Sequence, residues 1–314
     1  MKSILVRNKT LVSLIKTCRP RQWTKNLLIF AATLFTFEFS LNTWFSTFIV
    51  FICFCLISSS VYIINDIIDI NSDRKHPIKS KRPIPSGQIS IKSASILSIF
   101  LIISSCFISY SINPYVTATL ISYLIIQIFY CIGLKKQPIL DIFCIALGFI
   151  CRAIAGLFAS NSIASHWFIL TIGLLALFLA VEKRKAELRI SIQTGVTTRK
   201  VLNRYSLPLL QRLESLISSS SFMAYTLWSS GPSLNGAPSS WMLISVPFVL
   251  VGIFRYQLLS DPSDQERRKS KNSYISSEMP EEILLRDRGI QLSILGWLVT
   301  ILGVGIGSNL GLII

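Results

Sequence analysis

Three carboxylates and an amide lie close together at the end of an apolar run. They belong to Asp66, Asp69, Asp73 and Asn65. On a helix, side chains three or four positions apart lie on one face, and the steps between these residues follow that rule. Oxygen ligands of this kind suit a hard cation, chiefly Mg²⁺, which in turn binds phosphate. The pattern therefore predicts a metal and diphosphate site, and a soluble acidic loop is the plainer alternative.

The acidic residues follow a segment that is apolar enough to cross a bilayer. The 314-residue chain is 51% hydrophobic and 15% charged, which excludes an ordinary soluble domain. About 20 apolar residues span a membrane as a helix, and the alternating strands of a β-barrel are not seen. The pattern predicts an all-α polytopic membrane protein with nine transmembrane helices, of which the first and seventh are the weakest. These lie near residues 24–39, 43–65, 94–112, 114–133, 138–159, 164–181, 217–231, 240–259 and 290–312.

The distribution of positive charge predicts the orientation of these helices. The net charge of +16 would be compatible with nucleic-acid binding. If the N-terminus is cytoplasmic, however, every Lys and Arg except Arg152 lies in or next to a cytoplasmic segment, as the positive-inside rule requires. We therefore expect a lipid bilayer, and no nucleic acid, as partner. The expected parts are a basic cytoplasmic segment at 1–23 and a transmembrane domain at 24–314, with cytoplasmic loops at 66–93, 182–216 and 260–289.

A further carboxylate, Asp141, is expected near the cytoplasmic end of the fifth helix. With Gly148, Arg152 and Gly156 it forms one stripe along that helix. The glycines permit a close approach of helices, and an arginine inside a membrane needs an anionic partner from the protein or from a ligand. We expect Asp141 at the same depth as residues 66–73, so that both would line a central cavity open to the cytoplasm.

Basic residues are expected beside the acidic ones. Arg82 lies in a loop that three prolines and a glycine stiffen, and Lys183 and Arg184 end the sixth helix. Cations next to a metal–carboxylate face can neutralise the remaining charge of a diphosphate, although contact with lipid headgroups is an alternative for individual lysines. Lys25 and Asn26 begin the first helix, where membrane anchoring is the plainer interpretation.

The acidic motif in a basic, polytopic chain resembles the UbiA superfamily of intramembrane prenyltransferases. Over residues 18–313 the chain resembles one branch, the decaprenyl-phosphate phosphoribosyltransferases. The matching pieces read Arg19-Pro-x-Gln22-Trp23-x-Lys25-Asn26, Asn65-Asp66-x-x-Asp69-x-x-x-Asp73-Arg74-x-His76-Pro77, Tyr130-x4-Lys135-x5-Asp141, Arg152-Ala-Ile-Ala-Gly156, Lys183-Arg184-x-Ala-Glu187-Leu188 and Pro280-Glu281-Glu282-x-x-Leu-Arg286-Asp287-Arg288. Aromatic prenyltransferases usually carry two acidic residues four positions apart in their second motif. Here the residue four positions after Asp141 is Ile145, which is not acidic. That departure favours the phosphoribosyltransferase branch.

The resemblance implies an enzyme that transfers 5-phosphoribosyl from phosphoribosyl diphosphate (PRPP) to a polyprenyl phosphate, with Mg²⁺ as cofactor and loss of diphosphate. It implies a UbiA-type bundle in a bacterial-type plasma membrane, an active site that faces the cytoplasm, and compatibility with a homo-oligomer. The acceptor phosphate is already an anion at neutral pH, so no strong base is needed. The implied roles are catalysis for Asp66, Asp69 and Asp141; metal binding for Asn65, Asp66, Asp69 and Asp73; donor binding for Tyr130, Lys135, Arg82, Lys183 and Arg184; and lipid-phosphate binding for Lys25, Asn26 and Arg152.

Two other functions share part of this pattern. A UbiA-type enzyme could move a polyprenyl chain from its diphosphate to an aromatic acceptor, using the same fold and the same Asp66 and Asp69. A transporter or lipid-binding scaffold without chemistry would carry paired Gly/Pro breaks in two matching halves, and such paired breaks are not seen.

Overall fold

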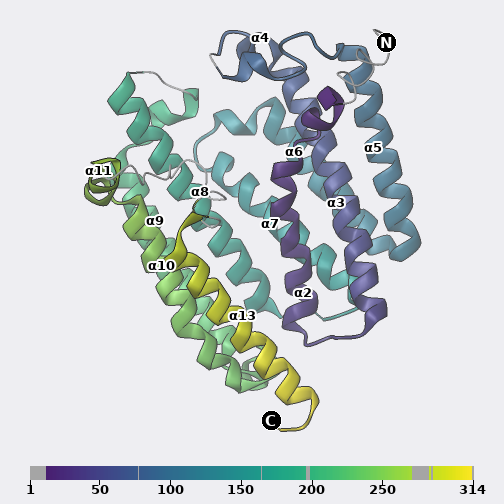
Figure 1. Cartoon of the computed structure of the whole chain (residues 1–314), viewed down its shortest axis with the longest axis vertical. Helices are drawn as coiled ribbons and strands as arrows, with labels where there is room; N and C mark the ends of the chain where they lie inside the picture. The colour runs from purple at the N-terminus through teal and green to yellow at the C-terminus, as the bar shows by residue number, and fades with distance from the viewer. Residues whose placement is uncertain are drawn as a thin grey trace. The chain divides into compact units, whose positions relative to one another are not determined.

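The computed structural model describes residues 12–76, 78–163, 165–195, 199–270, 283 and 286–312. All regular secondary structure in these residues is helical. The chain forms two compact units, which are described separately (Figure 1). The first unit comprises Met1–Thr33, Phe39–Lys135 and Cys151–Ser162, and the second comprises Leu34–Glu38, Lys136–Ile150 and Ile163–Ile314. The expected all-α fold is therefore confirmed for the described residues.

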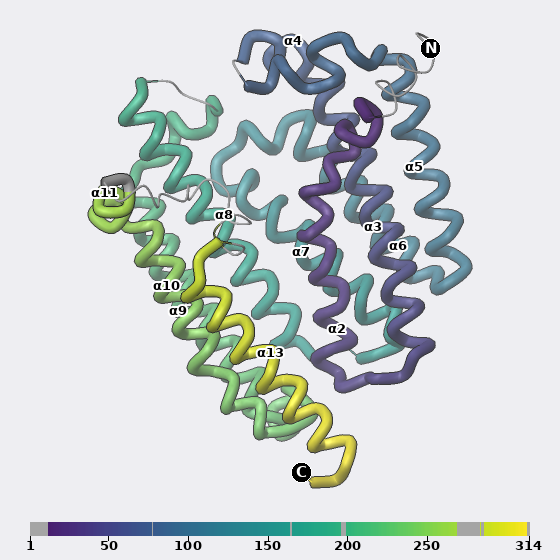
Figure 2. Tube along the Cα trace, viewed as in Figure 1, coloured from purple at the N-terminus to yellow at the C-terminus, as the bar shows by residue number. Residues whose placement is uncertain are grey.

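The first unit is built on the long helix α3, which packs against α5 and α6 (Figures 1 and 2). Polar side chains begin all three helices: Ser40, Ser90 and Asn113 each accept a hydrogen bond from an amide of the first turn. The elements are η1 (Pro20–Leu28), α2 (Ile29–Phe35), α3 (Leu41–Ile68), α4 (Ile70–Asp73), η2 (Lys79–Lys81), α5 (Ile91–Ile112) and α6 (Pro114–Ile132), together with the second half of α7 (Leu140–Ala159).

The core of the first unit lies where α3, α6 and α7 meet. Phe54, Leu120 and Ala155 are completely buried there. Gly156 on α7 lies so close to α2 that a Cβ atom at this position would overlap the carbonyl oxygen of Ile29. The expectation that a glycine on this helix allows a close approach is thus confirmed at Gly156.

The second unit pairs α8 with α9 and α10 with α13. A buried charge cluster joins the first pair, because Lys185 on α8 forms ion pairs with Glu182 on the same helix and with Glu214 on α9. The elements are the first half of α7, α8 (His166–Thr194), η4 (Lys200–Arg204), α9 (Leu207–Ser229), η5 (Pro232–Leu234), η6 (Ser240–Ser245), α10 (Val246–Ser260), α11 (Pro262–Ser270) and α13 (Arg288–Asn309). Of the short helix η3 (Leu134–Lys136), Leu134 and Lys135 belong to the first unit and Lys136 belongs to the second.

Seven helices among the described residues are long and apolar enough to cross a membrane. They correspond to seven of the nine predicted segments, and the two that fall short are the predicted first and seventh. The first is short because α2 has only seven residues. The seventh corresponds to α9, whose serine-rich sequence includes Arg212 and Glu214 and is therefore less apolar. The count of nine is not reached by this criterion.

Helices extend into two of the predicted cytoplasmic loops. Within 182–216, α8 continues to Thr194 and α9 already begins at Leu207, so most of this segment is helical. Within 260–289, residues Pro262–Ser270 form α11. Polar helical turns that extend beyond the apolar stretch are not visible to a reading based on hydropathy. Residues 1–11, Pro77 and the motif residues 280–282 lie outside the described residues.

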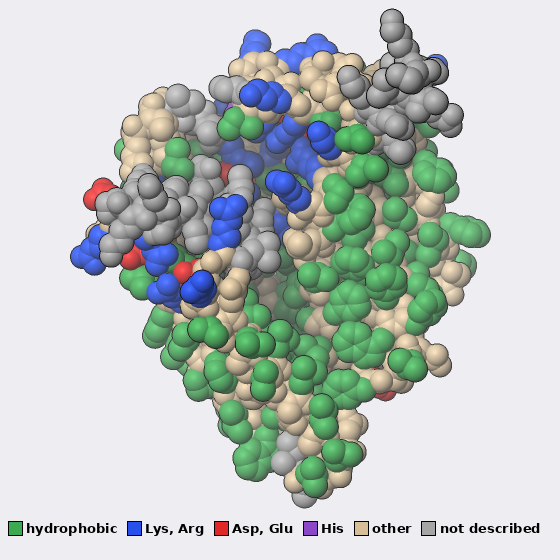
Figure 3. All heavy atoms as spheres, viewed as in Figure 1, with side chains coloured by type: hydrophobic (Ala, Val, Ile, Leu, Met, Phe, Trp, Pro, Cys, Tyr) green, Lys and Arg blue, Asp and Glu red, His purple; other side chains and the backbone are tan. Residues whose placement is uncertain are grey.

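The surface of the first unit separates apolar from basic side chains (Figure 3). Lys and Arg gather at the end that carries α4, whereas hydrophobic side chains cover the flank formed by the long helices. On α5, exposed large side chains include Ile96, Phe100, Ile103 and Phe107. An apolar surface of this extent is typical of contact with lipid.

Candidate active site

The acidic residues lie where α3 ends and α4 begins, at the end of the first unit (Figure 2). Asp69 is the last residue of α3's hydrogen-bonded turn, since its amide still donates to the carbonyl of Asn65. The amide of Asp73 then donates to the carbonyl of Asp69 at 2.8 Å, so the chain continues almost helically. This continuation brings Asp66 and Asp73, seven residues apart, to neighbouring positions, and both are buried.

A single guanidinium nitrogen joins two of these carboxylates. Nη1 of Arg82 donates to Asp66 at 3.0 Å and to Asp73 at 2.7 Å. Asp66 also accepts a hydrogen bond from Arg19, and Lys79 lies 4.0 Å from Asp73. Two carboxylates therefore already share one positive centre.

Lys135 connects the other two side chains of the acidic group, Asp69 and Asn65. Its ammonium group donates to both oxygens of Asp69, at 2.7 and 2.6 Å, and to the amide oxygen of Asn65 at 3.3 Å. The four side chains that carry the oxygen atoms thus form two pairs. Arg82 joins Asp66 to Asp73, and Lys135 joins Asn65 to Asp69. Tyr130, in the last turn of α6, lies five residues before Lys135 and is half-buried.

Arg152 and Asn26, both expected at the lipid phosphate, do come together in the first unit. Nε of Arg152 donates to the amide oxygen of Asn26 at 2.8 Å, and Nη2 donates to the hydroxyl of Tyr123 at 3.2 Å. The guanidinium also lies over the rings of Tyr123, 4.9 Å from its centroid, and Phe54. Asn26 is fully buried and Arg152 nearly so. These contacts link η1, α6 and α3 to α7, while Lys25 on η1 is half-buried.

Asp141 lies in the second unit and is completely buried together with Arg184. Nε of Arg184 donates to Oδ2 of Asp141 at 2.7 Å, and Arg184 also pairs with Glu187. The hydroxyl of Tyr205 donates to Oδ1 of Asp141 at 2.7 Å, while the same hydroxyl accepts from the amide of Ile139. Both oxygens of Asp141 are therefore held in place.

Burial raises the pKa of Tyr205, and its hydrogen bond to Asp141 acts in the same direction. The phenol therefore remains protonated at neutral pH and continues to donate to the carboxylate. Lys183, the other donor-binding residue expected on α8, is half-buried next to Arg184.

Several residues of these clusters were not among the predicted site residues, and Arg19 and Tyr205 are two of them. Arg19 was recognised as part of a motif but received no role, although the motif itself pointed to it. Tyr205 lies in a basic segment of the sequence, and no local pattern distinguishes it from other tyrosines. Only the fold brings it to Asp141, 64 residues earlier in the chain.

Comparisons with known proteins agree with this architecture. A model of the UbiA prenyltransferase family matches residues 26–277. The chain belongs to the UbiA prenyltransferase family.

Two relatives of this UbiA-family chain are named decaprenyl-phosphate phosphoribosyltransferase. The protein from Mycolicibacterium smegmatis is 36% identical, with 93% of this chain and 92% of the relative covered. The protein from Mycobacterium tuberculosis is 32% identical, with 91% and 92% covered. A solved UbiA homologue from Archaeoglobus fulgidus bound to GPP and Mg²⁺ is similar in fold, with a TM-score of 0.66, 18% identity, and 92% of this chain and 99% of that chain covered.

The oxygen donors of this UbiA member fit a divalent metal in their chemistry. Three carboxylates and an amide oxygen are hard ligands of the kind that Mg²⁺ prefers. Within the described residues, no three acidic, histidine or cysteine side chains are already arranged as a metal cage. The carboxylates of Asp66 and Asp73 nevertheless converge on one cationic nitrogen of Arg82, which shows that they can share a positive centre.

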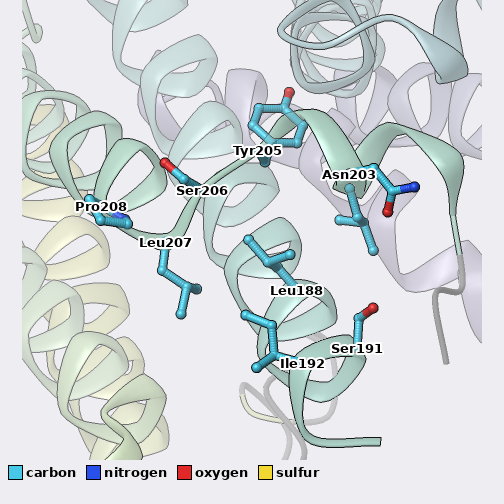
Figure 4. A pocket seen from close by; sticks show the side chains of 9 residues that line it. Leu188, Ser191, Ile192, Asn203, Tyr205, Ser206, Leu207 and Pro208 are labelled. Atoms are coloured by element: carbon cyan, nitrogen blue, oxygen red, sulfur yellow. The ribbon is translucent and has the colours of Figure 1, made fainter. Parts of the chain in front are cut away.

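A cavity of about 480 Å³ lies beside the Asp141 cluster in the second unit (Figure 4). Leu188, Ser191 and Ile192 of α8 form one side, and the segment from η4 to α9 forms the other. Tyr205 contributes to this wall as well as to the bond with Asp141. The lining combines apolar side chains with hydroxyl and amide groups and contains no charged side chain among those named for it.

Proposed function

We propose that this UbiA-family protein transfers the 5-phosphoribosyl group of PRPP to a polyprenyl phosphate and releases diphosphate. The bond from C1 of the ribose to the diphosphate breaks, its electron pair leaves with the diphosphate, and a bond from C1 to the lipid phosphate oxygen forms. The observation that carries the proposal is the match of the two named relatives along nearly the whole chain.

Asp66, Asp69, Asp73 and Asn65 are the residues that would hold Mg²⁺. The ion would supply charge neutralisation for the leaving diphosphate. The carboxylates that converge on Arg82, and the buried state of Asp66 and Asp73, support this assignment. In a water-poor site, fixed charges act more strongly than they would in solvent.

The cations around the acidic residues would bind the phosphates of the donor. Lys135 and Arg82 already contact the acidic residues. Tyr130 lies in the last turn of α6, five residues before Lys135, which belongs to η3. Lys183 and Arg184 belong to the same proposed group, and Asp141 would act as a catalytic residue whose position Arg184 and Tyr205 maintain.

Lys25, Asn26 and Arg152 remain the proposed contacts of the lipid phosphate. The hydrogen bond between Arg152 and Asn26 supports a shared role for these two residues. An arginine inside a membrane helix is costly, and an anionic headgroup would compensate its charge. The acceptor phosphate is an anion at neutral pH, so the reaction needs no residue to deprotonate it.

We further propose that the acidic residues face the cytoplasm, where water-soluble PRPP is available. The basic residues of the predicted cytoplasmic segments support this orientation by the positive-inside rule. In this arrangement, 1–23 is a cytoplasmic segment and 24–314 is the transmembrane domain.

The test is a turnover assay with purified protein in lipid nanodiscs. Radiolabelled PRPP and a polyprenyl phosphate should give a labelled lipid and release diphosphate only when both substrates and Mg²⁺ are present. Release of diphosphate from a polyprenyl diphosphate with an aromatic acid, without PRPP, would instead establish the prenyltransferase function.

The matched variants are Asp66→Asn and Asp264→Asn. Asp66→Asn removes a charge from the proposed metal site and should abolish turnover while the protein remains folded. Asp264 forms an ion pair with Arg268 within one turn of α11, and its replacement should leave turnover unchanged. Full activity of Asp66→Asn would disprove the metal assignment.

A further inference from the structure

Arg19 has an unusual backbone conformation and a defined partner. It precedes η1 with φ 52° and ψ 60°, in the left-handed region that residues with a Cβ atom rarely adopt. Its guanidinium lies over the ring of Tyr62, 4.9 Å from the centroid, and pairs with Asp66. A conformation of this kind persists only where surrounding contacts stabilise it, and such residues cluster at ligand sites and switches.

In this structure, the cations of the protein itself neutralise its acidic residues. Arg19 and Arg82 contact Asp66, Arg82 also contacts Asp73, and Lys135 contacts Asp69. Asp66 and Asp73 are 1% and 3% exposed, so solvent contributes little to their neutralisation. Removing one partner of a buried ion pair leaves an uncompensated charge, which is strongly unfavourable.

This arrangement opposes the binding of either ligand by itself. Two guanidinium groups already pair with Asp66, so a metal ion must compete with them for this carboxylate. The cations are likewise paired with carboxylates, so a diphosphate alone must compete with these carboxylates for the cations. A metal bound to diphosphate satisfies both, because the carboxylates receive the metal and the guanidinium groups receive the phosphate oxygens, for which their planar donors are well suited.

We propose that Arg19 is a counter-ion latch: it occupies Asp66 in the ligand-free protein and exchanges this carboxylate for a phosphate oxygen when the metal–diphosphate pair binds. The metal and the diphosphate therefore bind as a pair. The inference rests on the proposed function for the identity of the ligand, and it adds Arg19 and the mutual dependence of the two ligands. The exchange involves no covalent change.

The test is isothermal titration of the full-length protein with Mg²⁺ alone, with inorganic diphosphate alone, and with the preformed magnesium diphosphate complex. In the wild type, the complex should bind at least about tenfold more tightly than either component. Arg19→Ala removes the competitor of the metal but also a phosphate ligand. This variant should bind Mg²⁺ alone several-fold more tightly and magnesium diphosphate several-fold more weakly.

These opposite changes distinguish a latch from a structural role, because loss of local structure would weaken both kinds of binding. Arg19→Gln removes the charge but retains hydrogen-bonding capacity, and it should give the same signs if Arg19→Ala does not fold. Arg19→Lys keeps the charge and should restore the wild-type order of affinities. Thermal unfolding of each variant checks that the protein is folded.

The matched control is Arg74→Ala. Arg74 directly follows Asp73 at the end of α4, but its Nε donates to the carbonyl of Pro85 at 3.2 Å. Its removal should not increase the affinity for Mg²⁺ alone. The latch is overturned if Arg19→Ala and Arg19→Gln leave this affinity unchanged or lower it, or if the wild type binds Mg²⁺ and diphosphate independently.

The outcome is separable from that of the turnover assay. Inorganic diphosphate is a product of PRPP and of polyprenyl diphosphate chemistry alike. If the binding pattern is found but PRPP is not a substrate, the proposed function fails and the latch stands. If PRPP is turned over but the two ligands bind independently, the function stands and the latch fails.

Discussion

Arg184 and Asp141 form an ion pair in which both side chains are completely buried, with 2.7 Å between Nε and Oδ2. Charges removed from water in this way depend on each other, because the desolvation of each is compensated only by its partner. This pair is therefore a sensitive point of the second unit, and it involves two residues expected to act in catalysis and donor binding.

Replacing one member of this pair should destabilise the protein strongly. We expect Arg184→Met to lower the free energy of unfolding by about 3–5 kcal/mol, because Asp141 would remain buried and charged. The double variant Arg184→Met/Asp141→Asn should lose less than the sum of the single variants. Thermal unfolding in detergent measures these differences. For comparison, loss of the Asp264–Arg268 pair should cost only about 0.3–0.5 kcal/mol.

Tyr205→Phe tests whether the phenol positions Asp141. The change removes one hydroxyl that donates to Asp141 and accepts from the amide of Ile139. We expect a loss of about 1–3 kcal/mol in unfolding free energy, since buried polar groups lose their partners. Turnover measured well below the unfolding midpoint should also fall. Unchanged turnover in a folded Tyr205→Phe protein would show that Asp141 needs no such support.

Gly156→Ala tests the close approach of α7 and α2. An added Cβ would overlap the carbonyl oxygen of Ile29, and backbone must shift to accommodate it. We expect destabilisation of about 1–3 kcal/mol. Gly303 on α13 is a matched control, because a Cβ there meets no atom within 4 Å. Gly303→Ala should be neutral or stabilising by up to about 1 kcal/mol, since alanine is the better helix former. Equal effects at both sites would contradict the packing described here.

Removal of divalent metal should abolish turnover without unfolding the protein. The carboxylates at the end of α3 are already neutralised by Arg19, Arg82 and Lys135, so we expect the fold to persist without a bound ion. After chelation with EDTA, we expect the unfolding midpoint to change by less than about 2 °C, and excess Mg²⁺ should restore turnover. A large drop in the midpoint would indicate that the metal is a structural element.

Asp287 should make stability depend on pH in the acidic range. Burial alone would raise its pKa, but hydrogen bonds from Arg255 and from the amide of Ile290, with the charges of Arg255 and Arg268, outweigh burial and lower the pKa. The folded protein therefore binds this proton less readily than the unfolded chain does. The resulting stabilisation is present above the unfolded pKa of about 3.9 and is lost as the pH falls through the lower folded value.

Asp287→Asn is the variant that isolates this effect. Asparagine can still cap α13, where the Asp287 side chain accepts from the amide of Ile290, but it carries no charge. The unfolding midpoint of the variant should depend less steeply on pH below about 4 than that of the wild type. Identical pH profiles would show that the carboxylate charge contributes nothing.

The sequence by itself determined the helical class, seven of the helices that are able to span a membrane, and the acidic group from Asn65 to Asp73. These features are local: hydropathy over about 20 residues and a period of three to four residues are written in consecutive positions. Hydropathy did not indicate how far α8, α9 and α11 extend into the predicted loops, because polar helical turns give no hydropathy signal.

Only the tertiary structure decided which charge meets which. Arg19 pairs with Asp66 across 47 residues, Arg184 pairs with Asp141 across 43, and Tyr205 reaches Asp141 across 64. Such pairings depend on how far each helix is rotated and how closely it packs against its neighbours. Residues adjacent in the sequence carry little information about helix rotation or packing distance. The local spacing therefore predicted the acidic residues of the candidate site, and the packing of the helices selected their cationic partners.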